Sequence, residues 1–570
     1  MKKPFLFNRL ISNMKKTLLF LSLFLLGFTN STQAQLRTDA EMMAAAKSAL
    51  SNYPKAKRLI KEKGTNLEKL MTKSQVTIFG NEETGFAVIA NDKRNPAIMG
   101  YSDNKIDVNN LAPGFVWWLE GANESLERMI ATGQRPKAPV IKAAYRDHVD
   151  ELLITKWGQQ KPYNLMTPEY NVIGTTYAHY VTGCVATAMA QIMYYHKYPT
   201  RGKGQISYTM VPEAGTAIQI NGNFNTKFDW DNMLPVYKEG SYTEAQANAV
   251  ATLMKLCGAS VKMQYTITGS GAFTSDACRS MRKYFLYDEH MRYYFRDYFP
   301  IEEWMDIIFN EINNGYPMLY GGASSSGHEF ILDGYNDKGL VHVNWGWNGE
   351  QNGFFDIASL NGYSKQQEMV AVHPPHDDSK YVSLWGMSNG FYVTQIGSSF
   401  NVTNTVAYNF DVDEFNGELG LIAKNLETGE ESVLYTMQVS KVEMLKGLQI
   451  SNTGNISTTM WTPGQYRIYW ASKGNTEVEW QPIRCHETSY NSYILTKTGT
   501  GIKVEKDPNA NWTVSAINGV EYNDNKVIRV YDTTGKMVYA SPYKSFQVDD
   551  IPAKGILILK NGSIVKKIIK

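Results

Sequence analysis

The pattern of apolar and polar positions predicts helices and strands in the first quarter of the chain. Segments 76–79 and 85–90 are apolar runs with β-branched residues and are typical of buried strands. Segments 39–63 and 113–131 are predicted to be helices, the first of them rich in Lys. A turn- and Pro-rich connector, residues 133–139, follows the second helix. This connector predicts an exposed linker between two domains.

The pattern changes twice further along the chain. Residues 143–375 mix helical and strand periods and hold most of the Trp and His residues. From residue 380 to residue 496 polar and apolar positions alternate, as in 465–470, which predicts the half-buried strands of a β-sandwich. A short terminal β-unit is expected after 497–501. Together these patterns predict an α+β protein with several domains.

The N-terminus has the pattern of a secretory signal. Two pairs of Lys precede an apolar run, residues 17–28, and small and polar residues follow it up to 32–35. The run is too short for a membrane-spanning helix, which needs about 20 apolar residues. No Cys lies near the expected cleavage site, so lipid attachment is not indicated. A membrane anchor is the alternative, but we expect a mature chain that begins near Gln35 and leaves the cytoplasm.

Composition and charge exclude several classes of protein. The 570 residues carry 57 Lys and Arg against 55 Asp and Glu, a formal net charge of +2, which argues against a dedicated nucleic-acid binder. Four Cys in a chain of this length cannot form a disulfide framework. The sequence has no Cys-X-X-Cys or His-X-X-X-His pair, so neither a metal site nor a cofactor is expected.

Cys184 is the first candidate for chemistry, because it begins a predicted buried helix. The apolar residues that recur there at helical spacing are Val185, Ala188, Met189, Ile192 and Met193. The unpaired N–H groups and the dipole at a helix N-terminus favour a thiolate, which is the nucleophilic form of Cys. Gly183 leaves room for a substrate backbone to approach. The alternative is that Cys184 is a small buried apolar residue.

His328 is the best candidate for a base among nine His. His196 lies on the same helix as Cys184 but about 18 Å along it, so it is better interpreted as a cation near the helix C-terminus. His179 lies in a loop without an orienting partner. His328 instead begins an alternating strand, and a hairpin turn brings the Trp-rich strand 340–347 back beside it.

Four motifs together resemble the streptopain-like cysteine peptidases. In chain order they are 157–164, with the sequence Trp-Gly-Gln-Gln-Lys-Pro-Tyr-Asn, then 183–199, 327–334 and 342–349. Cys184 and His328 are 144 residues apart, within the range of about 130–150 that is typical of papain-like enzymes. The resemblance implies a papain-like two-lobed catalytic domain, with the Cys on a helical lobe and the His on a sheet lobe.

The resemblance also implies the role of each catalytic residue. Cys184 would be the nucleophile, and His328 would activate it and then protonate the leaving amine. Gln159 and the Cys184 backbone N–H would stabilise the oxyanion, an effect of about 3 kcal/mol per donor. Gln160 is the neighbouring alternative, and the choice of Gln159 rests on alignment to the Pro-Tyr-Asn sequence that follows.

The remaining predicted site residues surround this pair. Trp345, ranked first, and Asn344 would orient or shield His328, and Trp347 would form a wall of the cleft, although core packing is the alternative for both Trp residues. The loop 269–272 resembles the flexible substrate-cleft loop of the family, with a simple turn as the alternative. The predicted substrate-binding residues are Gly183, Gly269, Ser270, Gly271, Gly327 and Trp347.

The flanking regions fit the same family. Residues 35–142 resemble its inhibitory pro-domain, which would be removed by cleavage near 142–146; a stable accessory domain that is never cut is the alternative. The C-terminal motifs 530–538 and 555–560 resemble the type IX secretion sorting domain of Bacteroidetes. The predicted domains are 1–34, signal peptide; 35–142, pro-domain; 143–375, peptidase; 376–497, β-sandwich; and 498–570, sorting domain.

We therefore expect a secreted or cell-surface cysteine endopeptidase made as a self-inhibited zymogen. The resemblance implies a preference for a hydrophobic residue at the second position before the cut. The expected partners are protein or peptide substrates, the pro-domain and the type IX secretion machinery. A catalytically inert adhesin and a thiol acyltransferase are the alternatives. Cys257 and Cys278 are predicted to be structural and could form a disulfide.

Overall fold

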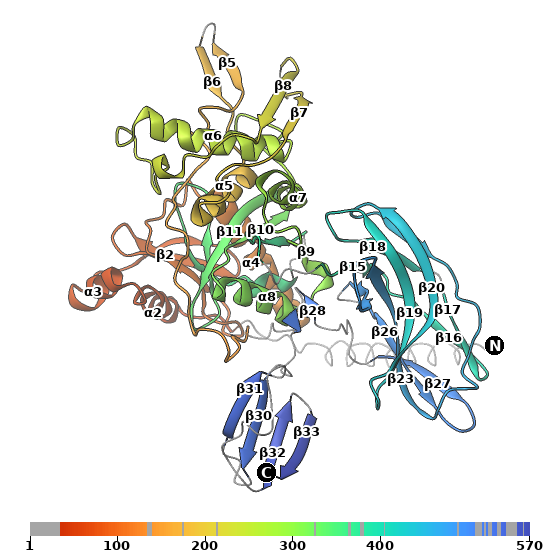
Figure 1. Ribbon diagram of the computed structural model, residues 1–570. Helices are drawn as coiled ribbons and strands as arrows, with labels where there is room; N and C mark the ends of the chain where they lie inside the picture. The colour runs from red at the N-terminus through yellow and green to blue at the C-terminus, as the bar shows by residue number, and fades with distance from the viewer. Residues whose placement is uncertain are drawn as a thin grey trace, which may run out of the picture.

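The computed structural model describes most of the chain after the expected signal peptide (Figure 1). The described residues are 35–133, 139–173, 176–212, 215–323, 327–362, 366–376, 381–403, 405–486 and 489–507, followed by the strand residues 516–517, 520–521, 527–532, 537–542, 556–561 and 564–569. The predicted signal peptide, 1–34, and most of the predicted linker, 134–138, lie outside them. No helix among the described residues is both long enough and apolar enough to cross a bilayer.

The N-terminal region begins with two helices where the sequence predicted one. They are separated because Pro54 lacks a backbone N–H and therefore starts a new helix instead of continuing the old one. Thr38 and Glu41 form a capping box at the start of the first helix. The elements of this region are α2 (Asp39–Leu50), α3 (Pro54–Glu62), β1 (Glu68–Thr72), β2 (Val76–Asn81), β3 (Gly85–Ala90), β4 (Ile98–Ser102) and α4 (Pro113–Thr132).

One ten-stranded sheet joins this region to the next. Its strand order is β1-β2-β3-β4-β13-β12-β11-β10-β14-β9, and the pairing of β4 with β13 makes the junction. Gly100 lies opposite Phe355 there, and a Cβ on that glycine would come 2.3 Å from the Phe355 ring. The later strands are β9 (Tyr293–Phe295), β10 (Met318–Ala323), β11 (Gly327–Tyr335), β12 (Val341–Asn344), β13 (Gly353–Phe355) and β14 (Glu368–Ala371).

Helices cover both faces of this sheet (Figure 1). Because side chains alternate along a strand, Phe330 of β11 packs with α4 and α8, whereas Ile331 packs with α5, α6 and α7. The elements on these faces are α5 (Cys184–His196), α6 (Glu244–Ser260), α7 (Thr274–Phe285) and α8 (Ile301–Asn313), with the hairpins β5 (Glu169–Ile173)–β6 (Thr176–His179) and β7 (Gln205–Met210)–β8 (Ile218–Asn223) and the short helices η1 (Trp230–Asn232), η2 (Arg296–Tyr298) and η3 (Ala358–Gly362).

A second β-rich region follows, with sheets arranged around one apolar core. Trp385, Phe400, Leu421 and Trp470 contribute to that core from strands of different sheets. The strands are β15 (Trp385–Met387), β16 (Val393–Ile396), β17 (Ser399–Val402), β18 (Thr405–Asn409), β19 (Phe415–Asn425), β20 (Glu431–Val442), β21 (Gly447–Ile450), β22 (Ile456–Ser457), β23 (Gly464–Gly474), β24 (Gln481–Pro482), β25 (Arg484–Cys485), β26 (Ser492–Lys497) and β27 (Ile502–Lys506).

The predicted boundary of this region at residue 497 divides a hairpin. β27 pairs with β26 in register, so the sheet continues to Lys506. Residues 498–501, after which the terminal β-unit was expected to begin, form the loop of this hairpin. A largely buried, bidentate ion pair connects this region to the part of the chain that contains the ten-stranded sheet. In it Arg484 donates to the Glu303 carboxylate at 2.6 and 2.9 Å.

The C-terminal residues form a separate small sheet (Figure 1). Its strand order is β31-β30-β32-β33, with antiparallel pairs throughout. Its strands are β30 (Val527–Asp532), β31 (Met537–Pro542), β32 (Ile556–Asn561) and β33 (Ile564–Ile569), preceded by the hairpin β28 (Ala516–Ile517)–β29 (Val520–Glu521). The predicted terminal β-unit is therefore present, although several residues of its two motifs lie outside the described residues.

Candidate active site

Cys184 is the first residue of α5, as the sequence predicted. Gly183 precedes it as the N-cap residue with a φ of 89°, a backbone conformation that strongly favours glycine. A Cβ on Gly183 would come 2.8 Å from the Met263 side chain and from the Ser270 carbonyl oxygen. The space that a side chain at position 183 would need is thus used by two neighbours in the protein, and the approach of a substrate backbone to Gly183 stays a prediction.

The Cys184 thiol is held in its protonated form. Burial of the sulfur is the largest of the causes that raise its pKa to about 11, and the charge of the nearby Glu329 carboxyl acts in the same direction. The Glu329 backbone N–H, close to the sulfur, and the N–H groups at the start of α5 oppose these effects. The expected thiolate is therefore wrong for this state of the protein, because desolvation outweighs the helix N-terminus.

His328 lies at the start of β11, where it pairs across the sheet with Gly322 of β10. Its side chain is half-buried, and burial lowers its pKa. Within the described part of the chain, the ring makes no hydrogen bond to Cys184. The Cys184 sulfur nevertheless lies beside the backbone of Glu329, which follows His328 along β11. The fold therefore brings the start of α5 next to the strand that carries His328.

Gln159 is brought to the same place by a backbone contact. Its carbonyl oxygen accepts a hydrogen bond of 3.1 Å from the N–H of Thr182, two residues before Cys184. Gln159 is buried, whereas Gln160 is exposed. Of the two alternatives that the sequence offered, Gln159 is therefore the one directed into the protein near Cys184.

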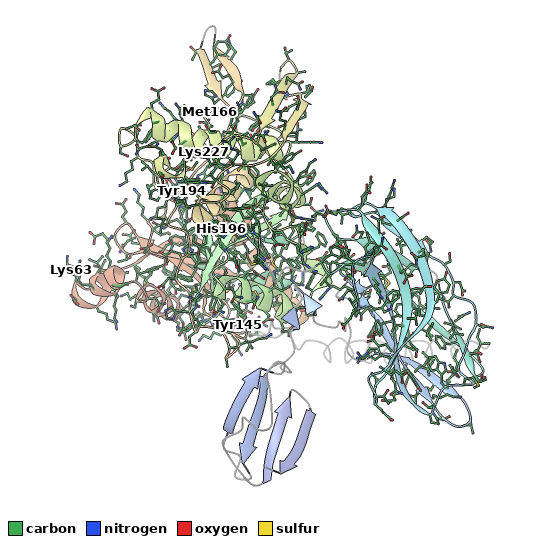
Figure 2. The ribbon with its side chains drawn as sticks, in the orientation of Figure 1. Lys63, Tyr145, Met166, Tyr194, His196 and Lys227 are labelled. Carbon is green, nitrogen blue, oxygen red and sulfur yellow. The ribbon has the colours of Figure 1, made fainter. Side chains whose placement is uncertain are left out.

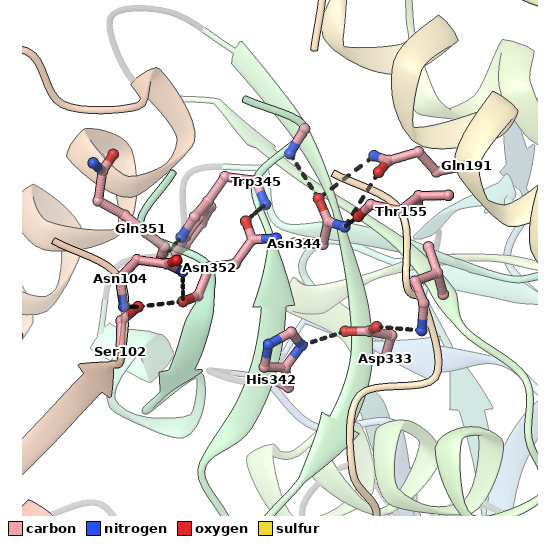
Figure 3. Close-up of polar contacts among 12 residues, drawn as sticks. Ser102, Asn104, Thr155, Gln191, Asp333, His342, Asn344, Trp345, Gln351 and Asn352 are labelled. Atoms are coloured by element: carbon pink, nitrogen blue, oxygen red, sulfur yellow. Dashed lines mark hydrogen bonds and ion pairs between the residues drawn. The ribbon is translucent and has the colours of Figure 1, made fainter. Parts of the chain in front are cut away.

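Asn344 has a different place from the one predicted (Figure 3). Its amide donates to the Thr155 carbonyl at 2.9 Å and to Gln191 of α5 at 3.2 Å, and its oxygen accepts from the Gly346 N–H at 3.0 Å. The prediction that Asn344 orients His328 is not supported by these contacts. Asn344 instead connects β12 to α5, and local sequence patterns could not indicate its contact with Gln191 because the two residues are 153 positions apart in the chain.

We expect the Asn344 contacts to stabilise the fold. Replacing Asn344 by Ala leaves the amide of Gln191 and the carbonyl of Thr155 buried without these partners, a loss of about 2–3 kcal/mol. Urea unfolding measures this loss in a Cys184→Ala background, where self-cleavage cannot interfere. Asn110→Ala, at an exposed site, is the matched control and is expected to change stability by less than about 0.5 kcal/mol.

Trp345 is packed in the core beneath the N-terminal region. Its indole N–H donates to the Gln351 carbonyl at 2.9 Å (Figure 3), and its ring lies 4.9 Å from that of Phe330 and 6.0 Å from that of Phe115 on α4. Core packing, the alternative interpretation, therefore describes Trp345 in this state. Trp347 is only half-buried, as a wall of a cleft would be.

The predicted cleft loop is anchored at its centre. The Ser270 hydroxyl donates to the Val181 carbonyl at 2.7 Å and accepts from the Thr266 N–H at 2.9 Å. Open space surrounds Gly269 and Gly271, and both are exposed. The loop is thus tied to the segment before Cys184, while Gly327, at the edge of β11, is also exposed.

The other candidates from the sequence lie away from this site. His196 ends α5 (Figure 2), and burial together with the His373 charge lowers its pKa to about 4, so it is neutral and not the predicted cation. Cys257 and Cys278 are buried, free thiols that do not form a disulfide. Among the described residues, no three His, Cys, Asp or Glu side chains are grouped so as to hold a metal ion.

Sequence comparisons place the chain among known peptidases. Residues 157–355 match the model of the Peptidase C10 family. Streptopain of Streptococcus pyogenes is 32% identical over 324 residues, which are 53% of this chain and 78% of streptopain. The chain belongs to the C10 family of cysteine peptidases. The matched residues contain Cys184, His328, Gln159 and Trp345.

Two further similar proteins extend the comparison. The thiol protease/hemagglutinin PrtT of Porphyromonas gingivalis is 30% identical over 365 residues, 58% of this chain but only 41% of PrtT. The chain therefore spans about two fifths of the length of that relative. The solved structure of a prointerpain A fragment from Prevotella intermedia is 38% identical and covers 55% of this chain and 99% of that fragment, with a TM-score of 0.51.

Proposed function

We propose that this C10 peptidase is a secreted endopeptidase that hydrolyses proteins through a Cys184–His328 dyad and a thioacyl intermediate. The observation that carries the proposal is the position of the Cys184 sulfur, at the N-terminus of α5 and beside the residue that follows His328. In a papain-like two-lobed arrangement, α5 belongs to the helical lobe and β11 to the sheet lobe. Substrate would bind between them.

The chemistry then follows from the three predicted catalytic groups. The His328 imidazole takes the proton of the Cys184 thiol, and the thiolate attacks the peptide carbonyl. The Gln159 amide and the Cys184 backbone N–H donate to the oxyanion. His328 next protonates the leaving amine, and water hydrolyses the thioester to release the acid and the free thiol.

We further propose that residues 35–142 act as an inhibitory pro-domain. Trp117 of α4 lies over Gly322, the residue paired with His328, because a Cβ on that glycine would come 2.1 Å from its indole. Phe115 of the same helix packs against Trp345. The N-terminal region thus packs against β10 and β11, the pair of strands that includes His328. The prointerpain A fragment, which its name describes as a precursor, is similar to this chain and also supports the proposal.

A cleavage assay tests the proposed function. The chain from Gln35 to Lys570 is incubated with casein, with and without a reductant. We expect conversion to a smaller species and casein hydrolysis only under reducing conditions, and mass mapping after iodoacetamide inhibition should find the alkyl group on Cys184. The three buried thiols, Cys257, Cys278 and Cys485, serve as internal controls because they should remain unmodified. An intact chain and intact casein would refute the proposal.

Gln159 and Gln160 form a matched pair for the oxyanion prediction. Gln159→Ala removes one proposed donor and should lower kcat by about 100- to 1000-fold while KM changes little. Gln160→Ala, at the exposed neighbouring position, should leave both constants within about twofold. Steady-state kinetics on one peptide substrate measures both variants, and equal losses in the two would contradict the assignment of Gln159.

The route out of the cell remains a proposal. The signal pattern of residues 1–34 and the resemblance of residues 498–570 to a type IX sorting domain support export through the periplasm and the outer membrane. Removal of the last small sheet, residues 527–570, should then trap the protein inside the cell envelope. Immunoblotting of medium and envelope fractions of a host with that secretion machinery measures the outcome.

A further inference from the structure

Asp306 is a buried acidic residue on α8, and its positive partner comes from the end of the predicted pro-domain. Asp306 is only 8% exposed. The Lys142 ammonium group donates to its Oδ2 at 2.9 Å, and the Tyr145 hydroxyl donates to its Oδ1 at 3.1 Å. Glu303, which precedes it on α8, is paired with Arg484. Lys142 thus supplies positive charge to a carboxylate inside the peptidase part of the fold.

The chain that follows this contact is fastened to the peptidase part. The Arg146 N–H donates to the Asn313 side-chain oxygen at the end of α8, at 3.0 Å. The Arg146 carbonyl accepts a hydrogen bond of 2.9 Å from the Tyr335 hydroxyl of β11. Val149 then pairs with Tyr335 as an antiparallel bridge. A cut in the expected region, 142–146, therefore creates a new N-terminus in a segment that stays attached to α8 and β11.

A cut at the predicted boundary, after Lys142, removes one cation and creates another. Burial raises the pKa of Asp306, and Lys142 opposes that rise, so the ionised carboxylate needs a positive partner when the N-terminal region leaves. Hydrolysis of the Lys142–Ala143 bond adds OH to the Lys142 carbonyl and H to the Ala143 nitrogen. The new α-amino group has an ordinary pKa of about 8, so it is mainly protonated at neutral pH.

The new α-ammonium group is within reach of Asp306. Two residues, Ala143 and Ala144, lie between the cut and Tyr145, and two extended residues span about 7 Å. Both are exposed and have small side chains, so they add little bulk where the long Lys142 side chain departs. With Tyr145 held through its hydroxyl, the chain end can turn towards the carboxylate oxygen that Lys142 leaves.

We propose that Asp306 binds the α-ammonium group of Ala143 in the cut enzyme, in place of the Lys142 side chain. The inference rests on the proposed function, because it needs the N-terminal region to be removed by a cut after Lys142. Asp306 then holds the linker in the intact chain and the new N-terminus in the cut chain. The start of the segment that leads to Gln159 stays fixed in both forms.

Amine labelling of the processed enzyme tests the inference. After processing under reducing conditions, mass mapping should find Ala143 at the new N-terminus. Brief acetylation near pH 7 then measures how readily its α-amino group reacts. Only the neutral amine reacts, and a carboxylate partner keeps the amine protonated. We therefore expect acetylation of this group to be about tenfold slower in the wild type than in Asp306→Asn, which corresponds to a pKa difference of about one unit.

Two controls separate this effect from general changes in reactivity. Asp337→Asn makes the same chemical change at an exposed site between β11 and β12, and its α-amino group should be acetylated as slowly as that of the wild type. Lys255 is exposed on α6 and should be acetylated at the same rate in all three proteins, which makes it the internal standard.

Each contrary result has one meaning. A new N-terminus other than Ala143, or equal acetylation of the wild type and Asp306→Asn, overturns the inference while the proposed function stands. If no cut form appears under reducing conditions, the proposed function fails and this inference fails with it. Should Asp306→Asn fail to fold or to be processed, the wild type alone decides. Its α-amino group should react about tenfold more slowly in the native enzyme than in urea, and equal rates overturn the inference.

Discussion

Replacing Cys184 by Ala should abolish self-processing and lower the hydrolysis of casein by about 10⁴-fold or more. The reason is that the proposed mechanism has no second nucleophile: the Cys184 sulfur must attack the peptide carbonyl and carry the acyl group. The other three thiols of the chain are buried and are not placed on a helix N-terminus beside β11. Gel analysis of the chain over time and casein hydrolysis at fixed protein concentration measure the two losses.

The controls separate a chemical loss from a structural one. Cys485→Ala removes a thiol from the second β-rich region, far along the chain from α5, and should process and cleave as the wild type does. His328→Ala should cause a loss similar to that of Cys184→Ala, and the double variant should be no worse, because the two residues act as a unit. Added wild-type enzyme should still cut Cys184→Ala at the linker. Casein hydrolysis by Cys184→Ala at the wild-type rate would exclude the thiol mechanism.

Local sequence patterns were sufficient to predict the two elements that carry the proposed dyad. Apolar spacing after Cys184 predicted α5, and the alternation after His328 predicted β11, because each pattern lies within one element. The same reasoning could not find the hydrogen bond between Thr274 of α7 and Glu329 of β11. The two residues lie 55 positions apart in the chain, so only the folded chain brings them together.

Long-range pairing also explains what the sequence missed in the fold. The strands β3 and β4 were expected to belong to a separate domain, because a turn-rich linker follows them. The local sequence pattern of β4 does not indicate that one edge of this strand pairs with β13, about 250 residues later in the chain. The thiolate expectation failed for a related reason, since burial of Cys184 depends on elements that come together only in the folded protein.

Cleavage of the N-terminal region should increase the alkylation rate of Cys184 at neutral pH by about 100-fold. In the intact chain the thiol pKa of about 11 leaves about one molecule in ten thousand as thiolate near pH 7. A Cys paired with an imidazolium has a pKa of about 3.5–7.5, which makes the thiolate the main form in the cut enzyme. The gain is smaller than the change in thiolate fraction, because a thiolate of lower pKa is a weaker nucleophile.

The two forms can be compared in one sample. A partly processed preparation is treated briefly with a fluorescent iodoacetamide. The intact and cut chains are then separated on a gel, and the fluorescence of each band is measured relative to its protein amount. Because the thiol pKa is raised, the intact chain should label slowly below about pH 10, and its labelling rate should rise as the pH approaches 11. The labelling rate of the cut chain should already be at its plateau near pH 7. Equal labelling of the two forms across this range would mean that the N-terminal region does not control the thiol, and that inhibition must act on His328 or on substrate access instead.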